Sequence, residues 1–143
     1  MTKNLGKHIL VVDDDPAQRS LLESFLSGQG FSVVTAASAQ DALDRFASAR
    51  PDMLVSDVRM PGMTGLELLD RVVSLHPGLP MLLVTAYADI RDAVGAMRGG
   101  AVDYLEKPID LDELLATVRH ALALNESGPA AVPEGFAVPE GMV

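Results

Sequence analysis

Residues 9–15 read ILVVDDD, a short apolar run that passes directly into three acidic residues. Similar runs follow at 53–57 (MLVSD), 81–85 (MLLVT) and 102–107 (VDYLEK). Short apolar runs with polar ends are typical of buried strands. Parallel strands end at one edge of a sheet, where open α/β proteins bind their ligands. We therefore expect one site at this edge, formed by Asp13, Asp14, Asp57, Thr85 and Lys107.

The fold class follows from how these runs are spaced. A further strand is predicted at 31–35, and apolar residues recur at helical spacing between the strands, as in Leu22 and Leu26. Strands that alternate with helices are typical of a parallel sheet covered on both faces. The sequence thus predicts a doubly wound α/β fold with five parallel strands, at 9–13, 31–35, 53–56, 81–84 and 102–105.

Helix-capping residues support this division. Asp15 before Pro16 fits a helix N-cap followed by proline in the first turn. We therefore assign Asp15 to capping and leave it out of the candidate site. Ser38 and Asp110 are each followed, three residues later, by an acidic residue, which also predicts a helix start.

Composition excludes several classes of function. The chain has 143 residues, which fits one domain, and contains no cysteine, which excludes thiol catalysis and cysteine-based zinc sites. Its net charge of −9 argues against direct binding of nucleic acid, which needs clustered lysine and arginine. No apolar stretch is long enough to span a bilayer, and the run at 9–12 is too short for a signal peptide. We expect a cytoplasmic protein.

The end of the chain has a different composition. Residues 131–142 consist of two similar hexapeptides, AVPEGF and AVPEGM. Proline and glycine at this density are typical of linkers. We expect one domain over residues 1–125 and a linker or tail over 126–143; the alternative is a tail that docks on this or a neighbouring molecule.

The acidic residues predict a cation site. Two carboxylates about 4 Å apart repel by roughly 4 kcal/mol at an effective dielectric constant near 20. Three such groups must share a proton, shift their pKa values upward or hold a cation. Oxygen ligands favour a hard ion, and a few carboxylates suit Mg²⁺. With a cation present, Asp57 can act as a nucleophile toward phosphorus, while Lys107 supplies charge and Thr85 a hydroxyl donor.

Four motifs in combination resemble one family. They lie at 10–15 (LVVDDD), 56–65 (SDVRMPGMTG), 84–86 (VTA) and 103–108 (DYLEKP). The chain resembles the response-regulator receiver domains, the CheY-like modules of two-component signalling, from about residue 8 to residue 124. The resemblance implies a flavodoxin-like (βα)₅ fold with strand order 2-1-3-4-5 and a cis peptide between Lys107 and Pro108.

The resemblance also implies roles for the site residues. Asp57 would accept a phosphoryl group from a sensor histidine kinase and would contact Mg²⁺. Asp14 would bind the ion directly and Asp13 through water. The backbone carbonyl of Arg59 would be a further ligand.

Other residues would respond to the phosphoryl group. By the same resemblance, Thr85 would contact it, Lys107 would pair with it and Tyr104 would be an aromatic switch. On the residues alone, Tyr104 is equally a half-buried strand aromatic with its hydroxyl at the surface. Arg59 and Tyr87 occupy the positions that tune the lifetime of the phosphate in this family.

Within the family, residues 85–104 look most like receivers of the NtrC type. These receivers precede an ATPase and a DNA-binding domain, so we expect a regulatory domain, without enzymatic activity of its own, that controls a transcriptional output domain. The resemblance makes a homodimer through the fourth helix and fifth strand plausible. A stand-alone receiver is equally consistent with the length.

Three other functions share features with this sequence. Phosphatases of the haloacid-dehalogenase type also use an aspartyl phosphate, but their nucleophile follows the first strand. Flavodoxin-like cofactor binders carry a phosphate loop rich in Ser, Thr and Gly after the first strand, where this chain has residues 13–15, all acidic. A degenerate receiver that only binds proteins would lack the complete five-residue set.

Overall fold

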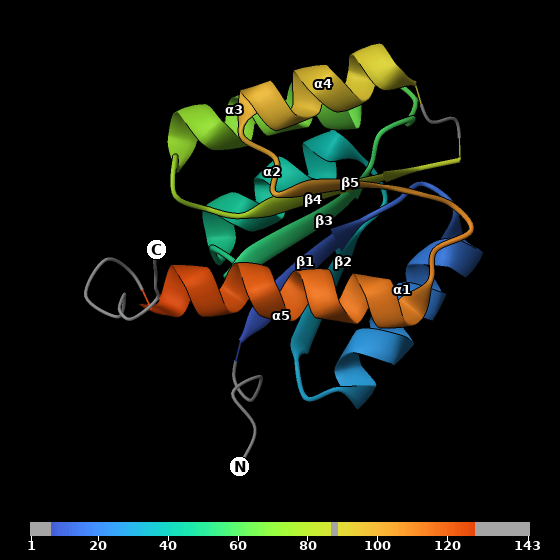
Figure 1. Ribbon diagram of the computed structural model, residues 1–143, viewed down its shortest axis with the longest axis vertical. Helices are drawn as coiled ribbons and strands as arrows, with labels where there is room; N and C mark the ends of the chain where they lie inside the picture. Colours follow the sequence, from blue (N-terminus) through green and yellow to red (C-terminus); the bar gives the residue numbers. More distant parts are fainter. Residues whose placement is uncertain (1–6, 87–88, 128–143) are drawn as a thin grey trace, which may run out of the picture.

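The computed structural model describes residues 7–86 and 89–127 (Figure 1). Five strands alternate with five helices along the chain. In order they are β1 (His8–Val12), α1 (Pro16–Gly28), β2 (Ser32–Ala36), α2 (Ala39–Ser48), β3 (Met53–Asp57), α3 (Gly65–Leu75), β4 (Met81–Thr85), α4 (Ile90–Gly99), β5 (Asp103–Glu106) and α5 (Leu111–Ser127).

The strands form one parallel sheet in the order β2-β1-β3-β4-β5. This confirms the predicted fold class and strand order. At most strand ends, the observed bound differs from the predicted bound by one residue. Phe31, predicted as the start of a strand, instead donates its backbone N–H to the carbonyl of Leu26 at the end of α1. Its side chain is buried, so its apolar character reflects core packing just before β2.

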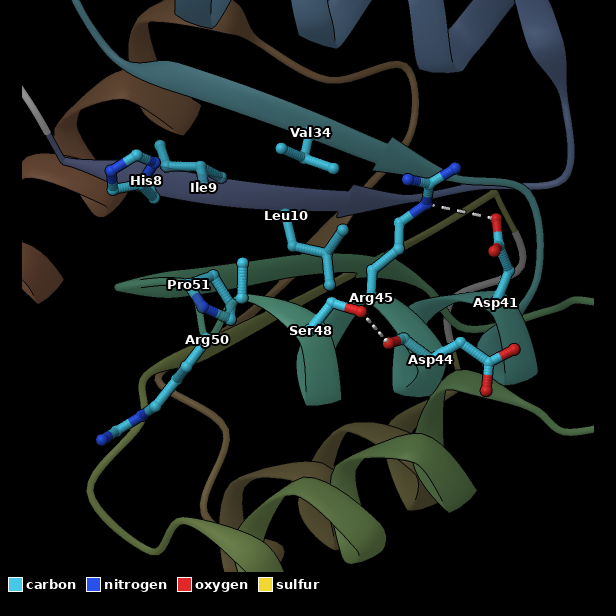
Figure 2. Close-up of a pocket in the computed structure, with 11 residues that line it drawn as sticks. His8, Ile9, Leu10, Val34, Asp41, Asp44, Arg45, Ser48, Arg50 and Pro51 are labelled. Carbon is cyan, nitrogen blue, oxygen red and sulfur yellow. Dashed lines mark hydrogen bonds and ion pairs between the residues drawn. The ribbon is translucent and has the colours of Figure 1, made fainter.

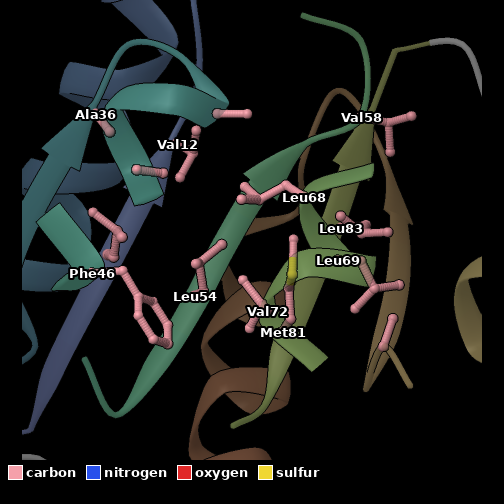
Figure 3. Close-up of a cluster of buried hydrophobic side chains, with 14 of the residues drawn as sticks. Val12, Ala36, Phe46, Leu54, Val58, Leu68, Leu69, Val72, Met81 and Leu83 are labelled. Carbon is pink, nitrogen blue, oxygen red and sulfur yellow. The ribbon is translucent and has the colours of Figure 1, made fainter. Parts of the chain in front are cut away.

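Two apolar layers hold the helices on the sheet. Helices α1 and α5 cover one face, and α2, α3 and α4 cover the other (Figure 1). Neighbouring residues of a strand point to opposite faces. Thus Val55 packs in the layer with α1 and α5, whereas Leu54 packs with Phe46 and Leu68 in the layer with α2 and α3 (Figure 3).

Capping residues begin the helices, and those at Asp15 and Ser38 are as predicted. The Asp15 carboxylate accepts the N–H of Ala17 at 3.0 Å, which confirms Asp15 as the N-cap of α1. Ser38 caps α2. In α3, Thr64 and Glu67 form a reciprocal capping box, in which each side chain accepts the other's backbone N–H.

Gly65 lets α3 begin directly against the end of β3. Its N–H donates to the carbonyl of Val58 at 2.8 Å. A Cβ at this position would collide with the backbone carbonyl oxygen of Asp57 and lie 2.9 Å from the Cα of Val58. Backbone atoms cannot move aside as a flexible side chain can. A side chain at position 65 would therefore displace the segment that carries Asp57.

We predict that Gly65→Ala lowers the free energy of unfolding by about 1–3 kcal/mol, the usual cost of overpacking. Gly95→Ala is the matched control, because Gly95 lies within α4 and an added Cβ would meet nothing within 4 Å. Alanine there favours the helix by about 0.5–1 kcal/mol. Urea denaturation of both variants checks this. Equal stability of the two variants would show that the contact at Gly65 relaxes freely.

Candidate functional site

The strand register brings the predicted site residues together. Val12 of β1 lies opposite Ser56 of β3, so the residues that follow them, Asp13 and Asp57, are neighbours. Thr85 of β4 lies opposite Glu106 of β5, which is followed by Lys107. The carboxyl ends of four strands thus lie at one edge of the sheet.

Three carboxylates and one lysine form the centre of the site. Asp13, Asp14 and Asp57 each offer an oxygen atom, and these atoms lie within 4.8 Å of one another. Asp13 is 1% exposed and Asp57 7%, whereas Asp14 is exposed. The Nζ atom of Lys107 lies 3.0 Å from Oδ2 of Asp13 and 3.1 Å from Oδ2 of Asp57. The lysine therefore bridges the two buried carboxylates.

Backbone groups fix the orientation of these carboxylates. The N–H of Asp15 donates to Oδ1 of Asp13 at 2.9 Å, and the N–H of Arg59 donates to Oδ1 of Asp57 at 3.2 Å. In both cases the donor comes two residues after the acceptor. The strand ends therefore turn so that each carboxylate is held by its own loop, with its second oxygen left for Lys107.

The electrostatics of the site oppose full ionisation. Burial raises the pKa of Asp57, and the charge of Asp13 adds to the increase, while the contact with Lys107 partly counteracts it. Burial also acts to lower the pKa of Lys107, but the hydrogen bonds and charges of Asp13 and Asp57 outweigh it, so the pKa is raised. The lysine thus stays protonated between the two acids. In this cluster, the positive charge of Lys107 faces the carboxylates of Asp13, Asp14 and Asp57.

The ligand atoms suit a hard cation. Every member of the cluster offers carboxylate oxygen, and the chain contains no cysteine thiolate. Histidine does not contribute to the cluster among the described residues. This donor set is that of a hard divalent ion. The residues present therefore fit a metal site of the predicted kind.

Thr85 and Tyr104 belong to the opposite face of the sheet from Asp57. Tyr104 packs in the layer with α2, α3 and α4, and Leu83 of β4 lies opposite it. Thr85 follows Leu83 by two residues and therefore belongs to the same face. Thr85 is fully buried, and its backbone carbonyl accepts the N–H of Lys107 at 2.7 Å.

The hydroxyl of Tyr104 is buried, in contrast to the expectation of a strand aromatic with its hydroxyl at the surface. No described residue makes a regular hydrogen bond to it. Burial accordingly raises the pKa of Tyr104, although the backbone of Asp89 lies near enough to act against the rise. An unpaired buried hydroxyl costs free energy, which a change of position or partner can recover.

The remaining sequence predictions have different outcomes. The peptide between Lys107 and Pro108 is cis, as expected. Tyr87 and the predicted tail from residue 128 onward lie outside the described residues. Helix α5 runs to Ser127, two residues past the predicted end of the domain. Among the described helices, none combines the length and apolar character needed to cross a membrane.

Sequence reasoning missed Arg19 of α1. Its Nη1 atom donates to the backbone carbonyl of Asp13 at 2.7 Å. The signal was available, because Arg19 precedes the buried Leu22 and Leu26 by three and seven residues. This spacing places an arginine on the inward stripe of the helix.

A pocket with a volume of about 410 Å³ lies away from the carboxylates (Figure 2). It extends between α2 and the start of β1. Leu10 and Val34 contribute apolar surface, and the ion pair of Arg45 and Asp41, 3.4 Å apart, lies beside them. None of the predicted site residues lines this pocket.

Comparisons with known proteins show the family to which the chain belongs. A family model described as response regulator receiver domain matches residues 9–119. The chain is 46% identical over 113 residues to the DNA-binding transcriptional regulator NtrC of Klebsiella pneumoniae, covering 79% of this chain and 24% of the regulator. It is 42% identical over 135 residues to the transcriptional regulatory protein ZraR of Escherichia coli, covering 94% and 31%. The chain thus spans about a quarter to a third of these relatives.

Solved structures give the same result. A CheY-like response regulator receiver domain protein from Methanospirillum hungatei has a TM-score of 0.82 and 32% identity, covering 85% of this chain and 97% of that one. NtrX from Brucella abortus, in complex with ADP, has a TM-score of 0.79 and 36% identity, covering 83% and 27%.

The raised pKa of Asp57 leads to a prediction about stability in metal-free buffer. The folded state binds the proton of the Asp57 carboxyl group more tightly than the unfolded state does. The resulting stabilisation is complete below the usual pKa of 3.8 and is lost as the pH rises through the raised value. We expect Asp57→Asn, which stays neutral, to be more stable than the unchanged protein at pH 7 and to lose this advantage near pH 4.

Urea denaturation in a chelator at several pH values checks this expectation. Asp15→Asn is the matched control, because asparagine caps a helix as well as aspartate does. If Asp57→Asn proved less stable than the unchanged protein at pH 7, the bridge to Lys107 would outweigh the cost of burying the charge.

Proposed function

Because this chain belongs to the response regulator receiver family, we propose that it is the phosphoacceptor switch of a two-component system, with Asp57 as the phosphorylated residue. One observation carries this proposal. The Asp57 carboxylate lies at the carboxyl edge of the sheet, where it contacts Lys107 and lies within 4.8 Å of oxygen atoms of Asp13 and Asp14. This arrangement suits transfer of a phosphoryl group better than it suits hydrolysis of a substrate or binding of a flavin.

We propose Mg²⁺ as the resident ion. Asp14 is exposed and would bind it directly, and the buried Asp13 would act through water. Asp57 and the backbone carbonyl of Arg59 would complete the protein's share of the ligands. When bound, Mg²⁺ supplies charge neutralisation for the phosphoryl oxygens as they approach the carboxylates.

The nucleophile of the proposed transfer step is a carboxylate oxygen of Asp57. In the proposed reaction, a carboxylate oxygen attacks the phosphorus of a phosphohistidine on the kinase. The new oxygen–phosphorus bond forms as the phosphorus–nitrogen bond breaks, and the electron pair of that bond returns to the imidazole of the kinase. Lys107, already 3.1 Å from Asp57, would stabilise the charge on the transferred group.

Thr85 and Tyr104 would transmit the change to the far face of the sheet. Thr85 is proposed to donate its hydroxyl to a phosphoryl oxygen, and Tyr104 to shift with it. The unpaired hydroxyl of Tyr104 supports this role, because its present position is not stabilised by a regular hydrogen bond among the described residues. Moving a two-state equilibrium from 1:99 to 99:1 requires about 5.5 kcal/mol. A few charge-assisted hydrogen bonds are of that order.

Arg59 and Tyr87 are proposed to tune the lifetime of the phosphate. Arg59 is exposed and follows Asp57 by two residues, so its side chain is a candidate to limit the access of water to the phosphoryl group. Tyr87 is placed in this role by the family resemblance alone.

The partners would be a sensor histidine kinase and an attached transcriptional output domain. NtrC and ZraR are transcriptional regulators that continue well beyond the matched region. We also propose a homodimer through α4 and β5. The exposed Ile90, Val94 and Met97 form an apolar stripe on α4, and Ile90 is 83% exposed.

We predict that a small phosphodonor with Mg²⁺ adds one phosphoryl group to the chain, detected by intact mass. Asp57→Asn should abolish the addition because it removes the nucleophile. Lys107→Ala should slow it by about 10²-fold or more, since one preorganised electrostatic partner of a transition state contributes that much. A chelator should prevent the reaction.

Asp15→Asn is the control for this experiment, because it changes a neighbouring carboxylate that caps α1. Its phosphorylation should match that of the unchanged chain. Undiminished phosphorylation of Asp57→Asn would refute the assignment of the phosphoacceptor.

For the homodimer, we predict that phosphorylation raises the sedimentation coefficient and that Val94→Glu keeps the phosphorylated chain monomeric. The exposed Leu75 at the end of α3 provides a control, Leu75→Glu, which should still dimerise. A phosphorylated chain that stays monomeric at high concentration would refute this dimer.

A further inference from the structure

Arg19 is the one cationic side chain that contacts the site from α1. Its backbone N–H donates to the carbonyl of Asp15, as in a regular first helical turn. Its side chain extends back past the helix start, where Nη1 donates to the backbone carbonyl of Asp13 at 2.7 Å. The side chain is half-buried, so this hydrogen bond is partly shielded from water.

The bond to Arg19 completes the set of hydrogen bonds that hold Asp13. The N–H of Asp13 donates to the carbonyl of Ala36 at 3.1 Å. Its two carboxylate oxygens accept from the N–H of Asp15 and from Lys107. Its carbonyl accepts from Arg19. Every polar group of Asp13 thus has a partner.

The carbonyl of Asp13 belongs to the peptide unit that leads into Asp14. A hydrogen bond to this oxygen fixes the plane of that peptide, because peptide units are rigid. Asp14 is exposed and offers a carboxylate oxygen to the cluster. Its side chain extends from the peptide unit that Arg19 holds, so the position of that peptide bears on where the Asp14 carboxylate lies.

We propose that Arg19 is a positioning residue for the metal site, which orients the peptide between Asp13 and Asp14 so that both carboxylates face the cation. This inference rests on the proposed function, since it concerns the same ion. Groups that orient metal ligands from outside the coordination sphere typically contribute 10-fold to 100-fold to metal affinity.

The charge of Arg19 acts in the opposite direction. A guanidinium close to the carboxylates repels a divalent cation, so removing it would strengthen Mg²⁺ binding if charge were its only effect. If Arg19 orients the peptide, removing it weakens binding. The sign of the change in Mg²⁺ affinity therefore separates the two roles.

The test is titration calorimetry with Mg²⁺ on the full chain, at a temperature where each variant is folded. We expect Arg19→Met to weaken Mg²⁺ binding about tenfold or more. Arg19→Lys should bind with intermediate affinity, because lysine keeps a donor but loses the planar fork. Arg119→Met is the control; Arg119 is exposed on α5, and its loss should leave the affinity unchanged.

The outcomes distinguish this inference from the proposed function. If the unchanged chain fails to bind Mg²⁺, the proposed metal site is wrong and this inference fails with it. If the unchanged chain binds and Arg19→Met binds equally well or more tightly, only the positioning role is overturned. If Arg19→Met does not fold, Arg19→Lys supplies the test: Mg²⁺ binding as tight as in the unchanged chain, or tighter, contradicts the positioning role.

Discussion

Repulsion among three carboxylates at one sheet edge is the constraint on which the site depends. The parallel register of β1 and β3 makes Asp13 and Asp57 neighbours, and the next residue, Asp14, adds a third charge. Lys107 offsets part of this repulsion through its contacts of 3.0 and 3.1 Å. The remaining negative charge would favour a divalent cation at this edge. In the proposed reaction, that cation would neutralise the charge as a phosphoryl group approaches Asp57.

The residues of the proposed chemistry and those of the proposed response lie on different faces of the sheet. Asp13 and Asp57 continue the strand positions that face α1 and α5, whereas Thr85 and Tyr104 belong to the face covered by α2, α3 and α4. Lys107 connects the two sets, because its side chain contacts the acids and its backbone bonds to Thr85. These contacts offer a short route from Asp57 toward the face that α4 covers.

The sequence was sufficient for the fold and for most of the site because both depend on strand ends. Apolar runs predict buried strands, and a polar residue after each run predicts a place at one edge. The peptide that Arg19 holds was missed, since a long cationic side chain on a helix is usually read as solvated. The buried hydroxyl of Tyr104 could not be foreseen either, because the depth of a side chain depends on how α4 packs. The roles of the ion and of the phosphoryl group rest on the family and on chemistry.

The central claim is that Asp57 takes a phosphoryl group in a site completed by Mg²⁺. The most direct measurement is a crystal structure of the chain with Mg²⁺ and beryllofluoride, which imitates a phosphoryl group. The account predicts beryllium bonded to a carboxylate oxygen of Asp57, Lys107 paired with a fluorine, and the ion bound by Asp14, Asp57 and the Arg59 carbonyl, with Asp13 reached through water. Beryllofluoride absent from Asp57, or an ion bound away from these residues, would contradict it.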